Sequence, residues 1–292
     1  MEIIDGVKIF EKVKKNVAKE VAYLLDNNLN LPHISAIVVG EDDSIDNVIS
    51  KKEKMMHESG FVFSIYHCPE NIKEEQLLEL IEFINADDEI DGIVLNLPLP
   101  VRFSSEKIIQ SIAPSKDVDG IHPDNLNKYY NQQDTYLSML PCLVGQILNH
   151  YSISAKNKNI LVATGSKGFY KMNENTLKSL KEFQTANCFN ICDIKNDNFN
   201  DLCKDADILI LDSGKPGEFK LDKIKENAVV IDLGMHKIIS VENESGYKII
   251  GDVDFKSVSK HSGLISKYNE SIEPLLYLNL LTNSLKAIKK EI

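Results

Sequence analysis

The chain has 292 residues, 43% of them hydrophobic and 26% charged, so it is long enough for two domains with separate cores. Its formal net charge of -11 excludes a nucleic-acid surface, which needs dense Lys and Arg. No apolar run reaches the roughly 20 residues that span a bilayer, and the chain start lacks a basic and then apolar leader. The five cysteines form no CxxC pair. We therefore expect a cytoplasmic protein with no membrane segment, no disulfide framework and no metal site.

The first half of the chain alternates amphipathic and apolar segments, which predicts helices and buried parallel strands. The predicted helices cover residues 9–25, 47–58 and 74–85, and a short one follows the capping residues Ser104 and Ser105. The predicted strands cover residues 34–39, 61–66 and 92–97. A polar, turn-rich passage at 114–134 then interrupts the alternation.

The second half repeats the alternation after a predicted helix at 141–150. Its strands are predicted at residues 159–163, 188–192, 207–211 and 228–233, and an amphipathic helix at 272–288. This order predicts an α/β protein of two domains with parallel sheets, the second one Rossmann-like and doubly wound. We place the first domain at 1–140, completed by the C-terminal residues 272–292, and the second at 141–271.

Specific strings recur along the whole chain. They include IIDG at 3–6, NADDEIDGIVLNLPLP at 85–100, KDVDGIHP at 116–123, ADILILDSGKPG at 206–217 and GDVDF at 251–255. In order and spacing they resemble the bifunctional methylenetetrahydrofolate dehydrogenase/methenyltetrahydrofolate cyclohydrolase family. The resemblance implies oxidation of 5,10-methylenetetrahydrofolate with NADP or NAD, and hydrolysis of 5,10-methenyltetrahydrofolate to 10-formyltetrahydrofolate. It also implies a homodimer and, in each chain, a folate-binding first domain, a dinucleotide-binding second domain and a cleft between them.

Matched residue by residue, the resemblance places a catalytic lysine at Lys52, its amide partner at Asn96 and a pterin-binding carboxylate at Asp119. A lysine in a partly desolvated site can move protons to and from water, and a carboxylate can accept both donors of a pterin edge. Asn96 is one methylene shorter than the family's glutamine, which reduces its reach. Without the resemblance, Lys52 is an ordinary exposed helix residue and Asp119 a turn residue before glycine.

The resemblance also points to substrate-binding positions: Val48, Pro98, Leu99, Tyr268 and Pro274. Val48 stands where the family has a tyrosine that stacks on folate, so we expect weaker affinity for folate. Tyr268 and Pro274 lie in the segment that replaces a glycine-rich family loop. The added bulk there predicts a weakened dehydrogenase step.

Candidate cofactor-binding residues follow three strands of the second domain: Gly165, Ser166, Lys167, Gly168, Asp193, Gly214, Lys215 and Pro216. Glycines in such turns let the backbone approach a pyrophosphate, although the bulky residues at 169–171 fit that role poorly. A carboxylate at Asp193 favours a ribose hydroxyl and repels the extra phosphate of NADP, so NAD is the expected dinucleotide. Alternatively, Asp193 opens a turn and Gly165–Gly168 is a plain polar loop.

Two further interpretations stay open at this point. The chain is either a family relative without catalysis that works as a binding or regulatory subunit, or a protein whose site has been remodelled for another small ligand, with Tyr268 and Lys171 as its wall. The retention of both Lys52 and Asp119 favours the folate enzyme.

Overall fold

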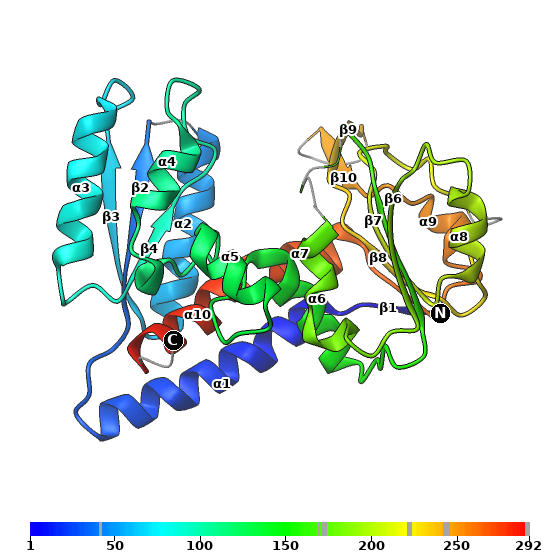
Figure 1. Cartoon of the computed structure of the whole chain (residues 1–292), viewed down its shortest axis with the longest axis horizontal. Helices are drawn as coiled ribbons and strands as arrows, with labels where there is room; N and C mark the ends of the chain where they lie inside the picture. The colour runs from blue at the N-terminus through cyan, green and yellow to red at the C-terminus, as the bar shows by residue number, and fades with distance from the viewer. Residues whose placement is uncertain are drawn as a thin grey trace. The chain divides into compact units, whose positions relative to one another are not determined.

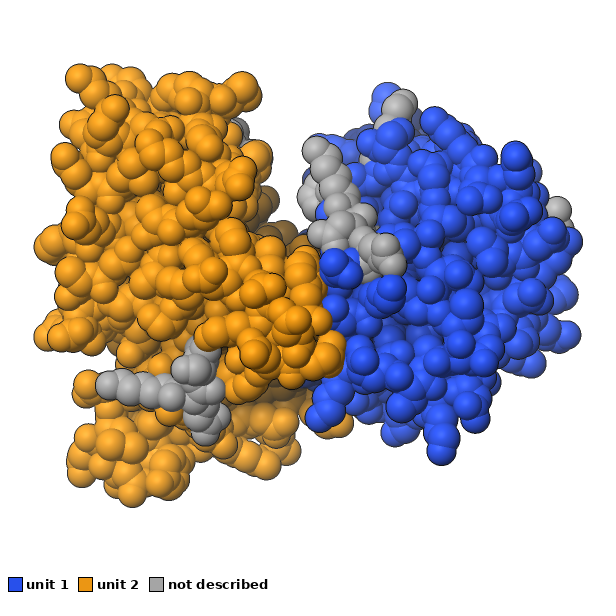
Figure 2. All heavy atoms as spheres, in the orientation of Figure 1, with its two compact units in different colours: residues 1–10, 143–276 blue, residues 11–142, 277–292 orange. Residues whose placement is uncertain are grey.

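The computed structural model describes residues 1–40, 43–166, 168, 170, 174–220, 224–241 and 246–289 (Figure 1). The chain forms two compact units (Figure 2). Unit 1 consists of Met1–Phe10 and Leu143–Leu276, and unit 2 consists of Glu11–Cys142 and Tyr277–Ile292. Both contain parallel sheets, so the predicted α/β class with two domains is confirmed.

Unit 2 is built on a three-stranded parallel sheet with the order β3-β2-β4. Its strands are β2 (His33–Val39), β3 (Val62–Cys68) and β4 (Gly92–Leu95). Its helices are α1 (Gly6–Asp26, which begins in unit 1), α2 (Asp43–Glu58), α3 (Glu74–Ala86), α4 (Ser105–Ser111), α5 (Pro123–Tyr130), the start of α6 (Met139–His150) and α10 (Leu278–Ile288). A short 3-10 turn, η1 (Pro114–Lys116), precedes an isolated parallel bridge from Asp117 to Ile93 of β4.

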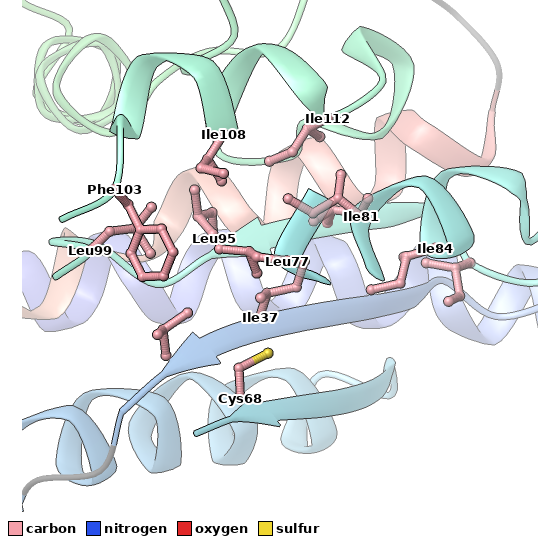
Figure 3. Packing of buried hydrophobic residues seen from close by; sticks show 13 residues of the cluster. Ile37, Cys68, Leu77, Ile81, Ile84, Leu95, Leu99, Phe103, Ile108 and Ile112 are labelled. Atoms are coloured by element: carbon pink, nitrogen blue, oxygen red, sulfur yellow. The ribbon is translucent and has the colours of Figure 1, made fainter. Parts of the chain in front are cut away.

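The core of unit 2 lies between the sheet and helices α3 and α4 (Figure 3). Leu77, Ile81 and Ile84 recur at helical spacing on α3 and are all fully buried. They pack in one cluster with strand side chains such as Ile37 of the central strand β2. At the start of α4, Ser104 caps the helix as the sequence predicts, since its hydroxyl oxygen accepts from the backbone N–H of Lys107 at 3.4 Å.

Unit 1 is built on a six-stranded parallel sheet with the order β1-β11-β8-β7-β5-β6. Its strands are β1 (Glu2–Ile3), β5 (Asn159–Thr164), β6 (Cys188–Asp193), β7 (Ile208–Asp212), β8 (Val229–Asp232) and β11 (Leu264–Ile265), with a separate antiparallel pair, β9 (His236–Ile239) and β10 (Tyr247–Ile250). Its short helices are α7 (Glu174–Lys178), η2 (Lys181–Phe183), α8 (Phe199–Asp205), α9 (Phe255–Val258), η4 (Tyr268–Ile272) and η5 (Glu273–Leu275).

The winding of this sheet reverses next to β5. The chain goes from β5 to its neighbour β6 and then returns to β7 on the other side of β5. In doubly wound sheets, ligands bind beyond the carboxyl ends of the strands at such a reversal. The topology therefore selects the loops that follow β5, β6 and β7.

The first ten residues group with unit 1, whereas the sequence placed them in the first domain. The cause is backbone pairing: β1 runs parallel to β11, and the Ser271 hydroxyl donates to the carbonyl oxygen of Ile4 at 2.5 Å. A two-residue strand is too short to show a periodic pattern.

The C-terminal helix is shorter than predicted, since α10 begins at Leu278. The segment from residue 268 forms instead a wider π turn, η4, and a tighter 3-10 turn, η5. Pro274 has no backbone N–H to donate, which interrupts regular α-helical bonding there. Helix α5 lies inside the passage that the sequence analysis treated as turns.

Candidate active site

Lys52 stands on α2 one helical turn after Val48, so both residues belong to one face of that helix. Only 8% of Lys52 is exposed. Within the described part of the chain, its Nζ forms no hydrogen bond and no ion pair. It lies over the ring of Tyr277, 5.7 Å from the ring centroid. Burying an ammonium group without an acceptor is costly. A ligand or water that accepts from Nζ would remove this cost.

Asp119 lies in the loop after η1 and interacts electrostatically with Lys52. Burial raises the pKa of the Asp119 carboxyl to about 6. The positive charge of Lys52 and a hydrogen bond with the Leu95 backbone both lower this pKa, and the negative charge of Asp117 raises it further. The side chain is half-buried. Unit 2 thus brings together the predicted lysine and the predicted carboxylate.

Helix α10 holds the Asp119 loop from one side through two buried asparagines. Asn279 Nδ2 donates to the carbonyl oxygen of Asp119 at 3.2 Å. Asn283 Nδ2 donates to the carbonyl oxygens of Val118 at 2.8 Å and Leu137 at 2.9 Å. The backbone of Asp119 is therefore fixed by side chains from the far end of the sequence.

Asp117 secures the same loop from the other side. Its Oδ2 accepts from the backbone N–H of His122 at 2.7 Å and from Asn125 Nδ2 at 2.9 Å. Gly120 adopts a φ of +68°, and a Cβ at this position would lie 2.6 Å from the carbonyl carbon of Leu137. The glycine that follows Asp119 is thus required by both conformation and space.

Asn96 follows directly after β4 and is only 7% exposed. Its Oδ1 has no hydrogen-bond partner among the described residues. The expected hydrogen bond from Lys52 is therefore not formed in this structure, in keeping with the short reach of asparagine. A buried amide oxygen without a donor is uncommon and is available to a donor on a ligand.

The other predicted substrate residues are dispersed. Leu99 belongs to the hydrophobic core of unit 2, and its contact with a ligand stays a prediction. Pro98 is exposed and Val48 is half-buried. Tyr268 and Pro274 belong to unit 1, and their role in binding folate stays a prediction.

Tyr277 was not among the predicted site residues; from the sequence it is only one residue of the amphipathic helix predicted at 272–288. It is the residue that precedes the first turn of α10, and its ring is half-buried beside Lys52. An aromatic residue inside a predicted amphipathic helix carries no distinctive sequence pattern. Contact with Lys52 arises only from the fold of unit 2.

A pocket of about 360 Å³ lies at the carboxyl ends of the unit 1 strands, where the sheet reverses its winding. Its lining contains six of the predicted cofactor residues: Gly165, Ser166, Asp193, Gly214, Lys215 and Pro216. A second pocket of about 190 Å³ shares Ile194, Ser213, Lys215 and Glu218 with it and reaches Phe199 and Phe219. The position and size of this pair suit an extended ligand rather than an ion.

The loops after β5 and β7 approach each other backbone to backbone. A Cβ on Gly165 would lie 2.1 Å from the carbonyl oxygen of Ser213, and one on Gly168 would lie 2.3 Å from that of Asp212. Gly168 is buried against Asp212 and is not among the residues that line the pocket. Lys167 lies outside the described residues, as do the bulky Phe169 and Lys171 of the same loop.

Asp193 closes a turn and also lies in the pocket, which are the two positions considered for it from the sequence. Its Oδ1 accepts from the backbone N–H of Lys195 at 2.8 Å, which closes a turn after β6. The side chain is exposed and also lines the larger pocket. A turn residue in this position can still present its second oxygen to a ligand.

Buried carboxylates hold the backbone of the pocket-lining loop after β7 in place. Asp252 accepts from the backbone N–H groups of Ser213 at 2.5 Å and Lys215 at 3.1 Å, and from His236 Nε2 at 2.6 Å. Asp232 accepts from backbone N–H groups that include that of Asp252 at 3.0 Å. Burial, together with the Asp252 charge, raises the pKa of Asp232 to about 7.

The part of the chain that the structure describes lacks two kinds of feature. No helix there is both long and apolar enough to cross a membrane. No three His, Cys, Asp or Glu side chains gather there in a way that could hold a metal ion.

Comparison with known proteins gives matches over both halves of the chain. Residues 4–119 match the tetrahydrofolate dehydrogenase/cyclohydrolase catalytic domain, and residues 139–292 match the NAD(P)-binding domain of the same family. A bifunctional protein FolD from Nitratiruptor is 34% identical over 290 residues, with 99% of each chain covered. One from Aquifex aeolicus is 33% identical, with 99% of this chain and 96% of the relative covered.

The fold agrees with these matches. A crystal structure of the bifunctional enzyme FolD from Campylobacter jejuni aligns over 100% of both chains, with a TM-score of 0.87 and 29% identity. The catalytic match includes Lys52 and Asp119, and the NAD(P)-binding match includes the glycine turn and both pockets. The chain belongs to the tetrahydrofolate dehydrogenase/cyclohydrolase family.

Proposed function

We propose that the chain oxidises 5,10-methylenetetrahydrofolate with NAD(P) and hydrolyses the resulting 5,10-methenyltetrahydrofolate to 10-formyltetrahydrofolate. Unit 2 holds the folate and unit 1 the dinucleotide. The observation that carries this proposal is the state of Lys52, a nearly buried ammonium group beside Asp119 with no hydrogen-bond acceptor among the described residues. Family membership supplies the substrate class.

In the hydrolysis, water adds to the bridging methenyl carbon, which is electron-poor because it lies between two nitrogens. Lys52 Nζ in its neutral form takes one proton from this water as the carbon–oxygen bond forms, which leaves a hydroxyl on the carbon. The hydroxyl then loses its own proton to solvent, the carbon–oxygen double bond forms, and the bond from the carbon to N5 breaks. The proton held by Lys52 passes to N5, which leaves the formyl group on N10. The step needs one proton carrier and no redox partner, which matches what unit 2 offers.

Asp119 and Asn96 orient the folate in this proposal. An ionised Asp119 accepts hydrogen bonds from the donors on the pterin edge, and the unpartnered Asn96 Oδ1 accepts another donor from the ligand or its water. Because the pKa of Asp119 is raised to about 6, the ionised form dominates only above that pH. Folate affinity therefore depends on pH close to neutrality.

The residues of unit 1 fit a dinucleotide. Gly165 and Ser166 line the larger pocket, and a glycine turn at the end of a strand lets a pyrophosphate approach the backbone closely. When bound, the nicotinamide ring supplies the acceptor for the hydride. The chain's own contribution is a pocket of defined shape, since Asp252 holds the backbone of Ser213 and Lys215 in place.

We propose NAD rather than NADP as the preferred dinucleotide. The carboxylate of Asp193 lines the pocket at the end of β6, where it can accept from ribose hydroxyls and repels an added phosphate. Lys195 and Lys215 line the same pocket and reduce this repulsion. The preference for NAD is therefore expected to be moderate.

We further propose that hydride transfer is the weaker of the two activities, because side chains such as Tyr268 replace a flat glycine-rich loop. A homodimer in the cytoplasm completes the proposal, on the ground of the family resemblance. Light scattering of the purified chain tests the dimer.

The test uses the purified full chain and three proteins: the wild type, Lys52→Met, and Lys54→Met as a control from the exposed face of α2. Hydrolysis is followed by the loss of the methenyl chromophore. Lys52→Met should lower kcat by at least about 100-fold, which is the usual contribution of a positioned proton carrier, while Lys54→Met stays within about twofold of the wild type. Equal rates for the wild type and Lys52→Met would overturn the proposal. A well-folded wild type without turnover or folate binding would favour the non-catalytic alternative.

A further inference from the structure

We infer that Tyr277 is a positioning residue for Lys52, so that its ring holds the ammonium group at the place where the folate reacts. The inference rests on the proposed function, because it concerns the lysine that carries out the hydrolysis. It assigns to the start of α10 a role that neither Val48 nor Asn96 performs in this chain.

The first step is the geometry of Lys52. Its Nζ lies 5.7 Å from the centroid of the Tyr277 ring, inside the range of about 6 Å at which a cation is attracted to an aromatic face. Among the described residues no hydrogen-bond acceptor reaches this Nζ. A lysine side chain has four rotatable bonds, so an ammonium group without any partner would sample many positions.

The second step concerns Asn96, the side chain that would otherwise fix the lysine. Its Oδ1 is buried and has no partner among the described residues. The amide therefore does not hold Lys52 in this structure. Positioning of the lysine has passed from the residue after β4 to the aromatic ring on α10, and the amide oxygen is left for the ligand.

The third step is that α10 also holds the other catalytic candidate. Tyr277 precedes the first turn of this helix, and Asn279 donates to the backbone of Asp119 from within that turn. Asn283, one turn later, donates to the carbonyl oxygen of Val118. A single rigid helix thus fixes the ammonium group through a ring and the carboxylate through its loop, which sets the separation between the two groups.

An aromatic ring suits this task better than a carboxylate does. The ring attracts the ammonium group without taking any of its three N–H donors in a directional hydrogen bond. Lys52 therefore keeps these donors for water and folate. The property belongs to the ring face and not to the phenol oxygen, so phenylalanine should replace Tyr277 and leucine should not.

The test compares Tyr277→Phe and Tyr277→Leu with the control Tyr23→Leu, which alters a tyrosine on α1 that is 60% exposed. We measure kcat and KM for methenyl hydrolysis and the affinity for a folate analogue. Tyr277→Leu should lower kcat roughly tenfold, as expected for loss of a partly desolvated cation–ring contact, with KM changed by less than about twofold. Tyr277→Phe and Tyr23→Leu should stay within about twofold of the wild type.

A double-mutant cycle separates positioning from a structural role. In the Lys52→Met background, with residual turnover measured at high enzyme concentration, Tyr277→Leu should cause no further loss. An equal loss with and without Lys52 would overturn the inference, as would a Tyr277→Phe variant as slow as Tyr277→Leu. Wild-type activity in Lys52→Met alone would refute the proposed function, so the two failures are distinguishable.

Discussion

The candidate sites of unit 2 and unit 1 differ in how their buried polar groups are bonded. In unit 2, Lys52 Nζ and Asn96 Oδ1 have no hydrogen-bond partner within the described residues. In unit 1, the carboxylates of Asp232 and Asp252 are bonded to backbone N–H groups around the pocket. Unsatisfied buried groups are rare in folded proteins and are kept where something else satisfies them. Unit 2 therefore presents reactive side chains, and unit 1 presents a shaped backbone.

Removing Asp252 is the strongest way to break this comparison. Asp252→Ala leaves the N–H groups of Ser213 and Lys215 and the imidazole of His236 without their acceptor. At about 1 to 2 kcal/mol for each orphaned group, we expect the free energy of unfolding to fall by about 3 to 6 kcal/mol and dinucleotide binding to be lost. Chemical denaturation and calorimetric titration with NAD measure the two effects.

Asp254→Ala is the matched control, since Asp254 lies in the same motif but only caps α9, with Oδ1 accepting from Ser257 N–H at 3.3 Å. Its expected cost is about 1 kcal/mol with dinucleotide affinity retained. If Asp252→Ala were no more harmful than Asp254→Ala, the contrast between the units would be wrong.

Asp119 sharpens the comparison, because a group that serves a ligand should control binding more than folding. Asp119→Asn should weaken affinity for a folate analogue about 100-fold at pH 8, since one charged acceptor is lost. In the wild type, affinity should rise about tenfold per pH unit up to a pH of about 6 and then level off, because only the ionised form accepts both donors. In the variant the affinity should not vary over this range. Titration calorimetry across pH gives both curves.

Folate affinity should rise with pH through the titration of Asp119, whereas the stability of the folded chain should fall with pH through the same titration. The pKa in the folded chain, about 6, lies above the ordinary value of 3.8, so the folded state binds the proton more tightly than the unfolded state. The free energy of unfolding should thus fall by about 1 to 3 kcal/mol as the pH rises from about 4 to about 6. Asp119→Asn should lack this decrease, and an identical decrease in the variant would assign it to other groups.

The asparagines of α10 test whether unit 2 also contains a rigid support beneath its reactive groups. Asn283→Ala removes the bonds to two backbone carbonyls, of Val118 and Leu137, and should cost about 2 kcal/mol. Asn279→Ala removes one bond, to Asp119, and should cost about 1 kcal/mol while lowering kcat for hydrolysis. Denaturation curves rank the two variants, and a reversed order would contradict the hydrogen-bond pattern.

The smallest expected effect concerns dinucleotide choice in unit 1. Asp193→Ser removes the carboxylate from the pocket but keeps a side chain that can accept from Lys195 N–H in the turn. NADP affinity should rise about five- to tenfold, while NAD affinity falls only a few-fold. Lys204→Ser on α8 is the control. A variant with an unchanged ratio of NAD to NADP affinity would show that Asp193 serves only its turn.

Much of the architecture could be predicted from sequence because buried parallel strands read as unbroken apolar runs. The runs at 34–39 and 159–163 correspond to β2 and β5. The positions of Lys52 and Asp119 came from a family resemblance, not from periodicity. The lining of the unit 1 pocket could be foreseen because parallel strands bring their following loops to one edge.

The parts that could not be predicted depend on contacts between segments remote in sequence. The ring of Tyr277 reaches Lys52 only through the packing of α10 in unit 2. The missing bond to Asn96 depends on one methylene of reach, and Leu99 belongs to the core although Leu97 and Pro98 before it are exposed. Strand β1 is too short for any pattern and is defined by its partner β11.

Because β1 pairs with β11, the two units cannot be separated by cutting the chain at a single position. A fragment that begins near residue 141 would lose β1 and leave β11, still paired with β8, as the exposed edge strand of the sheet, which invites aggregation. A fragment that ends there would lose α10, and with it Asn279, Asn283 and Tyr277. Neither half can be expressed as a faithful domain by cutting the gene once, so a dissected version needs residues 1–10 fused to unit 1 and α10 fused to unit 2.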